Sequence, residues 1–235
     1  MTPAERAQRT LRRTAPWIAV SLLLMAAVYV RALAFTPPEA AQGLAQKIFY
    51  VHVPSAWVAF LAFGIVGSVS LAYLVRKDPR LDLLAAAAAE VGMVFTTVVL
   101  VTGPIWGKPV WGTWWTWDAR LTLTLFLWFV VLAYLVLRGA VQEPERRARY
   151  AAVLGILGSL LVPFIYVSVY LFRTVHPMPV VLRAGGPTLP GSMRVTLFFS
   201  LAVFTLFFAV LLRYRFALAR LAEARARAAA ERADA

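Results

Sequence analysis

Apolar residues fall into six long runs along the chain, and polar residues are concentrated between those runs. Each run approaches the roughly 20 residues that a helix needs to cross the hydrocarbon core of a bilayer. The runs cover residues 17–35, 54–75, 83–105, 119–137, 150–172 and 195–212. This pattern predicts an all-α polytopic membrane protein with six transmembrane helices, and it shows no internal repeat, so we treat residues 1–235 as one integral-membrane domain.

Basic residues are distributed unequally between the two sides of this predicted bundle. The N-terminus, the second and fourth loops and the C-terminal tail hold 17 Lys and Arg residues, against seven on the other side. Because Lys and Arg are enriched in cytoplasmic loops, both termini are expected in the cytoplasm. The tail at 213–235 combines strong helix formers with mixed charge, which predicts a cytoplasmic helical extension.

Composition narrows the class of protein further. The chain is 61% hydrophobic and 15% charged, with a net charge of +13. The basic residues lie at helix ends and in short loops, so they indicate membrane topology and contact with lipid rather than nucleic-acid binding. Cysteine is absent, which excludes disulfides, thiolate metal sites and a cysteine nucleophile. The first run follows basic residues, as a signal peptide does, but its apolar stretch is longer than usual and we interpret it as a membrane span.

Two histidines, His52 and His176, are the only ones in the chain. Proline is favoured at the first position of a helix, so the second helix is predicted to begin at Pro54. His52 would then lie just before the helix, in extended backbone. His176 precedes Pro177, so the fifth helix is predicted to end before it. Both imidazoles then reach the outer face. They are either interfacial hydrogen-bonding groups or ligands, and two neutral imidazoles suit haem iron better than zinc, which takes three or four ligands.

The segment WGKPVWGTWWTWD at 106–118 places five of the eight tryptophans within twelve residues. A bilayer interface accounts for scattered tryptophans but not for this density. If the segment is helical, Trp111, Trp114, Trp115 and Asp118 share one face, which would support a flat aromatic ligand. Asp118 also stands where it would cap the fourth helix.

Charged residues on the outer side are candidates to bind carboxylates, because arginine holds a carboxylate through two hydrogen bonds. Arg120, Arg173 and Arg183 are such candidates, and the sequence does not select among them. Glu90 falls within the third run, where a carboxylate is either functional or placed near the cytoplasmic interface.

The motif WGKPVWGTWWTWDARLT, with HVPSAW around His52 and VHP around His176, closely resembles cytochrome c maturation protein C, also called haem exporter protein C. That family belongs to a wider group of haem-handling membrane proteins with a tryptophan-rich WWD signature. The resemblance extends over the whole chain, with six spans and three outer loops in matching order.

The resemblance implies a protein of the bacterial cytoplasmic membrane that binds haem b transiently and non-covalently at the outer face. It implies that His52 and His176 are the axial iron ligands and that the WWD loop holds the macrocycle. In this chain the loop residues are Trp106, Trp111, Trp114, Trp115, Trp117 and Asp118. Haem would pass to a membrane-anchored haem chaperone, in a complex with ABC transporter subunits and a small single-span protein.

Three functions remain open from the residues. The first is haem binding and delivery in c-type cytochrome biogenesis, with no enzymatic activity, because no catalytic nucleophile or acid–base pair is evident. The second is a bis-histidine electron-transfer cytochrome. The third is a transporter that carries haem across the bilayer, for which polar or broken-helix features at mid-membrane are few.

Overall fold

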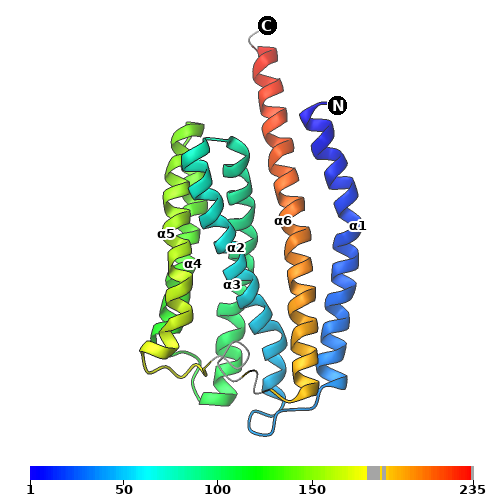
Figure 1. Cartoon of the computed structure of the whole chain (residues 1–235), viewed down its shortest axis with the longest axis vertical. Coiled ribbons are helices and arrows are strands. Elements are labelled where there is room, and N and C mark those ends of the chain that lie inside the picture. Colours follow the sequence, from blue (N-terminus) through cyan, green and yellow to red (C-terminus); the bar gives the residue numbers. More distant parts are fainter. Residues whose placement is uncertain (179–185, 187–188, 234–235) are drawn as a thin grey trace.

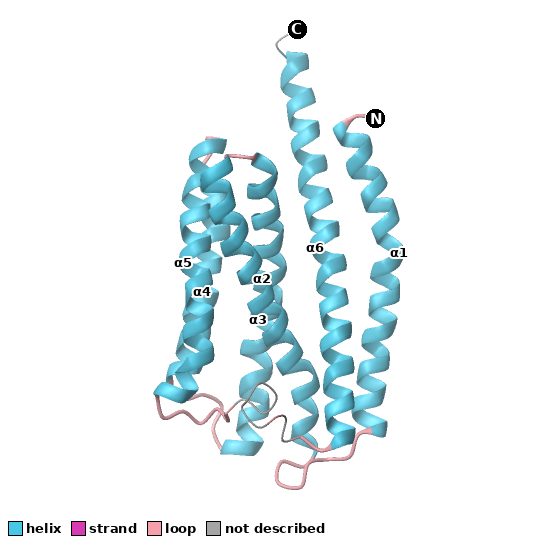
Figure 2. Cartoon of the chain, viewed as in Figure 1, coloured by secondary structure: helices cyan, strands magenta, loops and turns pink. Residues whose placement is uncertain are grey.

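The computed structural model describes residues 1–178, 186 and 189–233, and in these residues every long element is a helix (Figure 2). The α-helices are α1 (Pro3–Val30), α2 (Phe49–Arg76), α3 (Pro79–Trp111), α4 (Ala119–Ala140), α5 (Pro144–Leu171) and α6 (Gly191–Ala233). A π-helical turn, η1 (Arg31–Phe35), extends α1, and a 3-10 turn, η2 (Leu44–Ile48), leads into α2. All six helices are long and apolar enough to cross a membrane, which confirms the predicted fold class.

Most helices run beyond the hydrophobic stretches that predicted them. Asp78 and Glu143 cap α3 and α5 with side chains that accept backbone N–H groups of the first turn, and a proline follows each cap. These start sequences are polar, so a hydropathy pattern omits them although they favour a helix N-terminus. The helical extension predicted at 213–235 is present in the described residues. It is the continuation of α6 to Ala233, and residues 234–235 lie outside the described part of the chain.

The helices form two groups, which are visible in Figure 1. Helices α1 and α6 lie side by side, and α2 to α5 form a cluster next to them. On the cluster side, Phe95 of α3 packs against Phe204 and Phe207 of α6, with ring centroids 6.2 and 6.3 Å apart. Just after η1, the hydroxyl of Thr36 forms a buried hydrogen bond of 2.8 Å with the hydroxyl of Thr196 in α6. Helix α1 begins and helix α6 ends at the same end of the molecule.

Small residues line the contact between α2 and α5. A Cβ atom on Gly67 would lie 2.6 Å from Cβ of Ser159, and one on Gly155 would lie 2.9 Å from Oγ of Ser70. Such seams let helix backbones approach closely, which is how helices associate where lipid removes the hydrophobic driving force. His52 lies near the start of α2, so the position of this helix also sets one wall of the site described below.

We expect Gly67→Ala to destabilise the protein, because the added methyl group has no space at the α2–α5 seam. Overpacking of this kind costs about 1–3 kcal/mol. The matched control is Gly64→Ala on the same helix, where no atom lies within 4 Å of the added Cβ. The unfolding midpoint in detergent should fall for Gly67→Ala and stay level or rise for Gly64→Ala. Equal midpoints for the two variants would contradict a tight seam.

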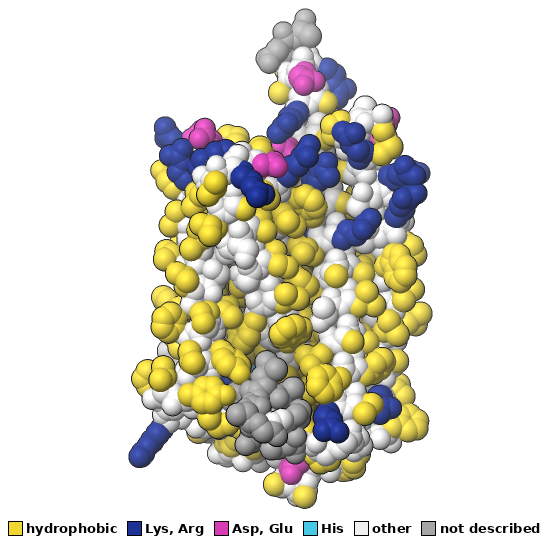
Figure 3. Space-filling model, viewed as in Figure 1, with side chains coloured by type: hydrophobic (Ala, Val, Ile, Leu, Met, Phe, Trp, Pro, Cys, Tyr) yellow, Lys and Arg dark blue, Asp and Glu magenta, His cyan; other side chains and the backbone are white. Residues whose placement is uncertain are grey.

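Most Lys and Arg side chains visible in Figure 3 gather at the end that carries the chain termini. Two interhelical ion pairs lie on this side of the molecule. Arg138 of α4 binds Asp82 of α3, with Nη2 and Oδ2 2.9 Å apart. Arg215 of α6 donates from Nε to Glu90 of α3 at 2.6 Å. Glu90 therefore joins α6 to the α2–α5 cluster, and this pairing favours a structural role for it.

Candidate functional site

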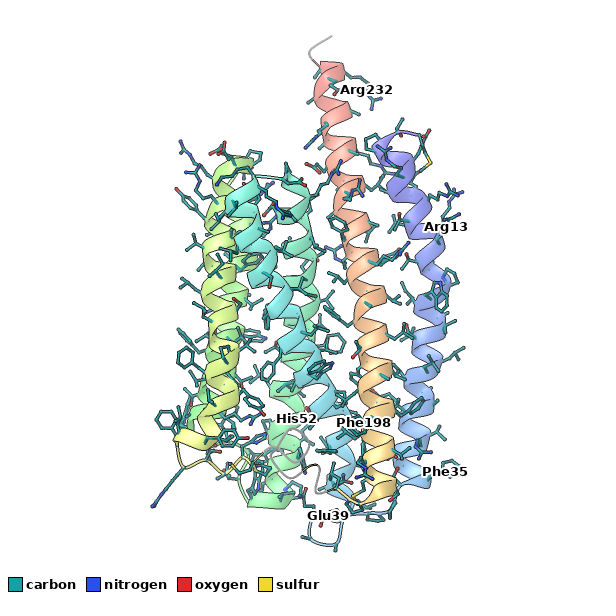
Figure 4. All side chains as sticks on the ribbon, viewed as in Figure 1. Arg13, Phe35, Glu39, His52, Phe198 and Arg232 are labelled. Carbon is teal, nitrogen blue, oxygen red and sulfur yellow. The ribbon has the colours of Figure 1, made fainter. Side chains whose placement is uncertain are left out.

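A cavity opens between α2, α3, α4 and α5, and its wall includes His52, which lies at the end opposite to Arg13 and Arg232 (Figure 4). Its volume is about 1040 Å³, including open solvent at the mouth. The cavity brings together both histidines, four tryptophans and one arginine. These residues are His52, Trp106, Trp111, Trp114, Trp115, Arg120 and His176.

His52 lies in the first turn of α2, and only 8% of its surface is exposed. The prediction that the helix begins at Pro54 and leaves His52 in extended backbone is wrong. The helix begins five residues earlier, at Phe49, and both Phe49 and Tyr50 are buried in a cluster with Trp106. This tertiary packing outweighs the preference of proline for a helix start.

The His52 imidazole is held from the side of α3. Its Nδ1 lies 2.9 Å from Oγ1 of Thr102. A Cβ atom on Gly103 would lie 3.4 Å from its Cε1, so the ring packs directly over the backbone there. The ring edge also meets Trp106, with centroids 5.7 Å apart. Three residues of α3 therefore fix the His52 ring in the protein without ligand.

His176 follows α5, which ends at Leu171 as the proline pattern predicts. Its backbone N–H donates to Oγ1 of Thr174 at 3.0 Å, and its Nδ1 lies 3.0 Å from the carbonyl oxygen of Pro177. A carbonyl only accepts, so Nδ1 carries the hydrogen and Nε2 keeps a free lone pair. Burial, together with the positive charge of Arg120, lowers the pKa of His176 to about 4. The imidazole is therefore neutral at pH 7.

A row of aromatic rings connects the two histidines along the cavity wall. After the contact between His52 and Trp106, the rings of Trp106 and Trp111 stack with centroids 6.5 Å apart and planes inclined by 30°. Trp111 in turn lies 6.4 Å from the ring of His176. Nε1 of Trp106 donates to Oε1 of Gln42 at 3.0 Å, which ties the first outer loop to this row. Segments 52, 106–111 and 176 thus converge on one cavity.

The tryptophan segment is helical only in its first half. Helix α3 continues to Trp111 and ends at Gly112, whose φ of +77° suits glycine. Residues 112–118 are not helical, so the condition under which Trp111, Trp114, Trp115 and Asp118 would share a helical face is not met. Trp114 and Trp115 instead reach the cavity from the loop, and Trp111 reaches it from the last turn of α3.

Trp117 and Asp118 are not part of the cavity wall. Trp117 is 77% exposed and meets Trp115 edge to face, with centroids 5.8 Å apart. Asp118 caps α4, because its Oδ1 accepts the backbone N–H groups of Arg120 at 3.0 Å and of Leu121 at 3.1 Å. Its other oxygen accepts the Thr116 hydroxyl at 2.9 Å. The expected helix cap is therefore present, and it fixes the end of the loop.

Two buried donors on the cavity wall have no hydrogen-bond partner among the described residues. They are Nη1 of Arg120 and Nε1 of Trp115. Both groups only donate, and a buried donor without a partner costs about 1–3 kcal/mol. A carboxylate is an acceptor that complements donors of this kind, above all the charged guanidinium of Arg120. The arrangement therefore fits a ligand that carries a carboxylate.

Of the remaining arginine candidates, the structure describes Arg173 only. Arg173 is exposed and is not on the cavity wall, and Arg183 lies outside the described residues. The sequence reasoning missed the inner wall, which is formed by Phe60, Thr96, Leu127 and Ile165. These residues have the composition of any membrane span, so only their orientation identifies them. Thr102 was missed for the same reason.

Comparison with known proteins gives a consistent result. The family model described as Heme exporter protein C matches residues 1–231. Heme exporter protein C of Bradyrhizobium diazoefficiens is 40% identical over 199 residues, which are 85% of this chain and 76% of the relative. The protein of that name from Haemophilus influenzae is 36% identical over 198 residues, covering 83% and 80%. The one from Escherichia coli K12 is 38% identical over 166 residues, covering 68% and 66%. The chain therefore belongs to the Heme exporter protein C family.

Proposed function

We propose that this chain binds haem in the cavity, at the outer face of the cytoplasmic membrane, and delivers it to a membrane-anchored haem chaperone for c-type cytochrome biogenesis. The observation that carries the proposal is the cavity wall, where both histidines of the chain and four tryptophans of one segment meet. The names of the relatives, which are heme exporters, agree with a role in transfer rather than catalysis.

His52 and His176 are the proposed axial ligands of the haem iron. Neutral imidazole nitrogen is a common haem ligand, and His176 keeps Nε2 free for that purpose. The chain contains no cysteine, so no thioether bond from this protein to a haem vinyl group can form. The proposed cargo is therefore haem b, held non-covalently and reversibly.

The rest of the cavity wall is suited to the two chemical regions of the haem edge, which are the apolar hydrocarbon edge and the charged propionates. The inner residues Phe60, Leu127 and Ile165 are apolar and suit the hydrocarbon edge of a porphyrin. Arg120 and the indole N–H of Trp115 offer unpaired donors to a propionate. Trp106, Trp111 and Trp114 provide aromatic surface for the macrocycle, while Asp118 acts indirectly by holding the end of the loop.

The two histidines are held with unequal rigidity, and this difference favours delivery of haem over its permanent retention. His52 is buried in a helix, whereas His176 lies in a loop and is partly exposed. One ligand is thus anchored and the other is placed where a partner can displace it. An electron-transfer cytochrome gains from two rigid ligands, because rigid ligation keeps reorganisation between oxidation states small. This contrast favours the first of the three functions.

Transport across the bilayer through this chain alone is less well supported. On α3 the cavity wall extends from Trp111 only to Thr96, and on α4 it extends from Arg120 only to Leu127. Further along α3, the five alanines at 85–89 are all buried in close packing. The cavity therefore occupies one half of the bundle and has no continuation among the described residues toward the other end.

The proposed sidedness follows from charge. The basic end with both termini is assigned to the cytoplasm by the positive-inside rule, so the cavity opens on the extracytoplasmic side. Family membership further suggests ABC transporter subunits and a small single-span protein as partners of the chain in one complex.

The proposal is tested by haem titration of the protein in lipid nanodiscs, followed in the Soret region. We expect one haem per chain with a six-coordinate spectrum. Trp111→Leu should weaken haem binding by about two- to tenfold, because an aromatic contact contributes about 0.5–1.5 kcal/mol beyond its area. Trp117→Leu is the matched control from outside the cavity wall and should bind like the wild type.

Delivery is measured in the same preparation by adding the purified haem chaperone and following the haem that becomes chaperone-bound. If Trp111→Leu and Trp117→Leu bound haem with equal affinity, the tryptophans at 106–118 would be better explained as an aromatic belt at the bilayer interface. A wild-type chain that binds no haem would remove the proposal.

A further inference from the structure

Thr102 contacts His52 through a hydroxyl that has only one hydrogen to give. Oγ1 of Thr102 lies 2.7 Å from the carbonyl oxygen of Val98, in its own helix, and 2.9 Å from Nδ1 of His52. A carbonyl oxygen can only accept, so the Thr102 hydrogen is used in the bond to Val98. The same oxygen is then an acceptor toward the imidazole, and both bonds form only if Nδ1 carries a hydrogen.

We infer that Thr102 is a positioning residue that holds His52 in the Nδ1–H tautomer and so leaves Nε2 as the lone-pair nitrogen of that ring. The inference rests on the proposed function where it concerns haem, and on the protein alone where it concerns the tautomer. With this assignment both histidines carry their hydrogen on Nδ1, since Nδ1 of His176 donates to the carbonyl of Pro177.

Two physical consequences make this contact relevant to ligation. The hydrogen bond fixes which nitrogen meets a metal and how the ring is oriented. It also raises the basicity of the coordinating nitrogen, because the donated hydrogen moves electron density into the ring. A more basic axial ligand stabilises ferric over ferrous iron. Loss of the Thr102 hydroxyl should therefore weaken ferric haem binding and raise the reduction potential.

The first experiment needs no haem. The chain has two histidines, so labelling with ¹⁵N-histidine gives two imidazole spin systems in apo-protein, and His176→Ala assigns them. At pH 8 we expect both wild-type rings to show a protonated Nδ1. Thr102→Val should lose this pattern at His52 alone, and Thr102→Ser should keep it. Thr97→Val, which removes a hydroxyl of the same helix from outside the cavity wall, should leave both rings unchanged.

The second experiment measures ferric haem affinity and the midpoint potential of the same variants. Loss of an outer hydrogen-bond partner typically costs about 10–100-fold in metal affinity, so we expect a loss of this size for Thr102→Val and a higher potential. Thr102→Ser should restore both. Thr102→Ala also removes the hydroxyl and should give the same result as Thr102→Val. Unchanged His176 signals in these variants would show that the protein is still folded.

The outcomes separate this inference from the proposed function. A wild-type His52 protonated on Nε2, or an unchanged His52 spectrum in Thr102→Val, would overturn the inference even if haem binds. The expected nitrogen spectra in a protein that binds no haem would overturn the proposed function and leave the tautomer assignment standing.

Discussion

Replacement of His52 by alanine is expected to lower haem affinity by more than about 100-fold, which is above the usual effect of removing a partner of a metal ligand. The size of this loss of affinity follows from the preorganisation of the His52 ring. The His52 ring is held by Thr102, Gly103 and Trp106 in the apo-protein, so it loses little conformational freedom when it ligates. If His52 ligates the iron as proposed, the alanine variant loses both the iron–nitrogen bond and a ring that is already oriented for binding.

His176→Ala should have a smaller effect, and the difference between the variants is the informative quantity. His176 stands in a loop and is held by its neighbours Thr174 and Pro177 alone among hydrogen-bond partners in the described structure. Its ligation therefore includes the cost of ordering the loop, and its loss removes less net affinity. We expect this variant to retain five-coordinate haem on His52, and the double variant to lose the six-coordinate spectrum entirely.

Absorption and magnetic circular dichroism spectra of haem-loaded protein measure these differences. Free imidazole provides the control for folding, because it should enter the space left by His52→Ala and restore a six-coordinate spectrum if the cavity is intact. Equal losses in the two single variants would argue against unequal anchoring. A double variant with an unchanged spectrum would remove both histidines from the iron.

The helical architecture was predictable from sequence because each span is marked by a long apolar run, and the hydrophobic requirement of a bilayer is a strong constraint. The helix ends were less predictable. Starts such as Asp78-Pro79 and Glu143-Pro144 are polar, and the α2 start depends on burial of Phe49 and Tyr50 against residues distant in sequence. Local preference at Pro54 pointed to a later start, and tertiary packing overrode it.

The residues of the candidate site were predictable from sequence where their residue type is rare in the chain. They were less predictable where the residue type is common. Two histidines and one dense tryptophan segment stand out by type, and the structure brings them to one cavity. Thr102 and the inner apolar wall have no such distinction, because threonine and leucine are ordinary residues in membrane helices. Among the arginines, only geometry separates Arg120 on the wall from exposed Arg173.

Arg120→Leu is expected to lower the affinity for haem by between about tenfold and a hundredfold. Its Nη1 is a buried donor without a partner among the described residues, and a hydrogen bond between charged groups contributes about 1.5–3 kcal/mol. The backbone N–H of residue 120 continues to bind the Asp118 cap in the variant, so the α4 start is retained. Trp115→Phe removes only the indole N–H and should cost less, about two- to tenfold.

The carboxylate assignment is tested by changing the ligand as well as the protein. Wild-type protein should prefer haem over haem dimethyl ester, in which both propionates are neutral, and Arg120→Leu should lose most of this preference. Arg173→Leu is the matched control, because that arginine is exposed and absent from the cavity wall. If Arg120→Leu weakened haem and its ester equally, the arginine would act on the shape or stability of the cavity rather than on a propionate. The preference would then have to reside in other donors.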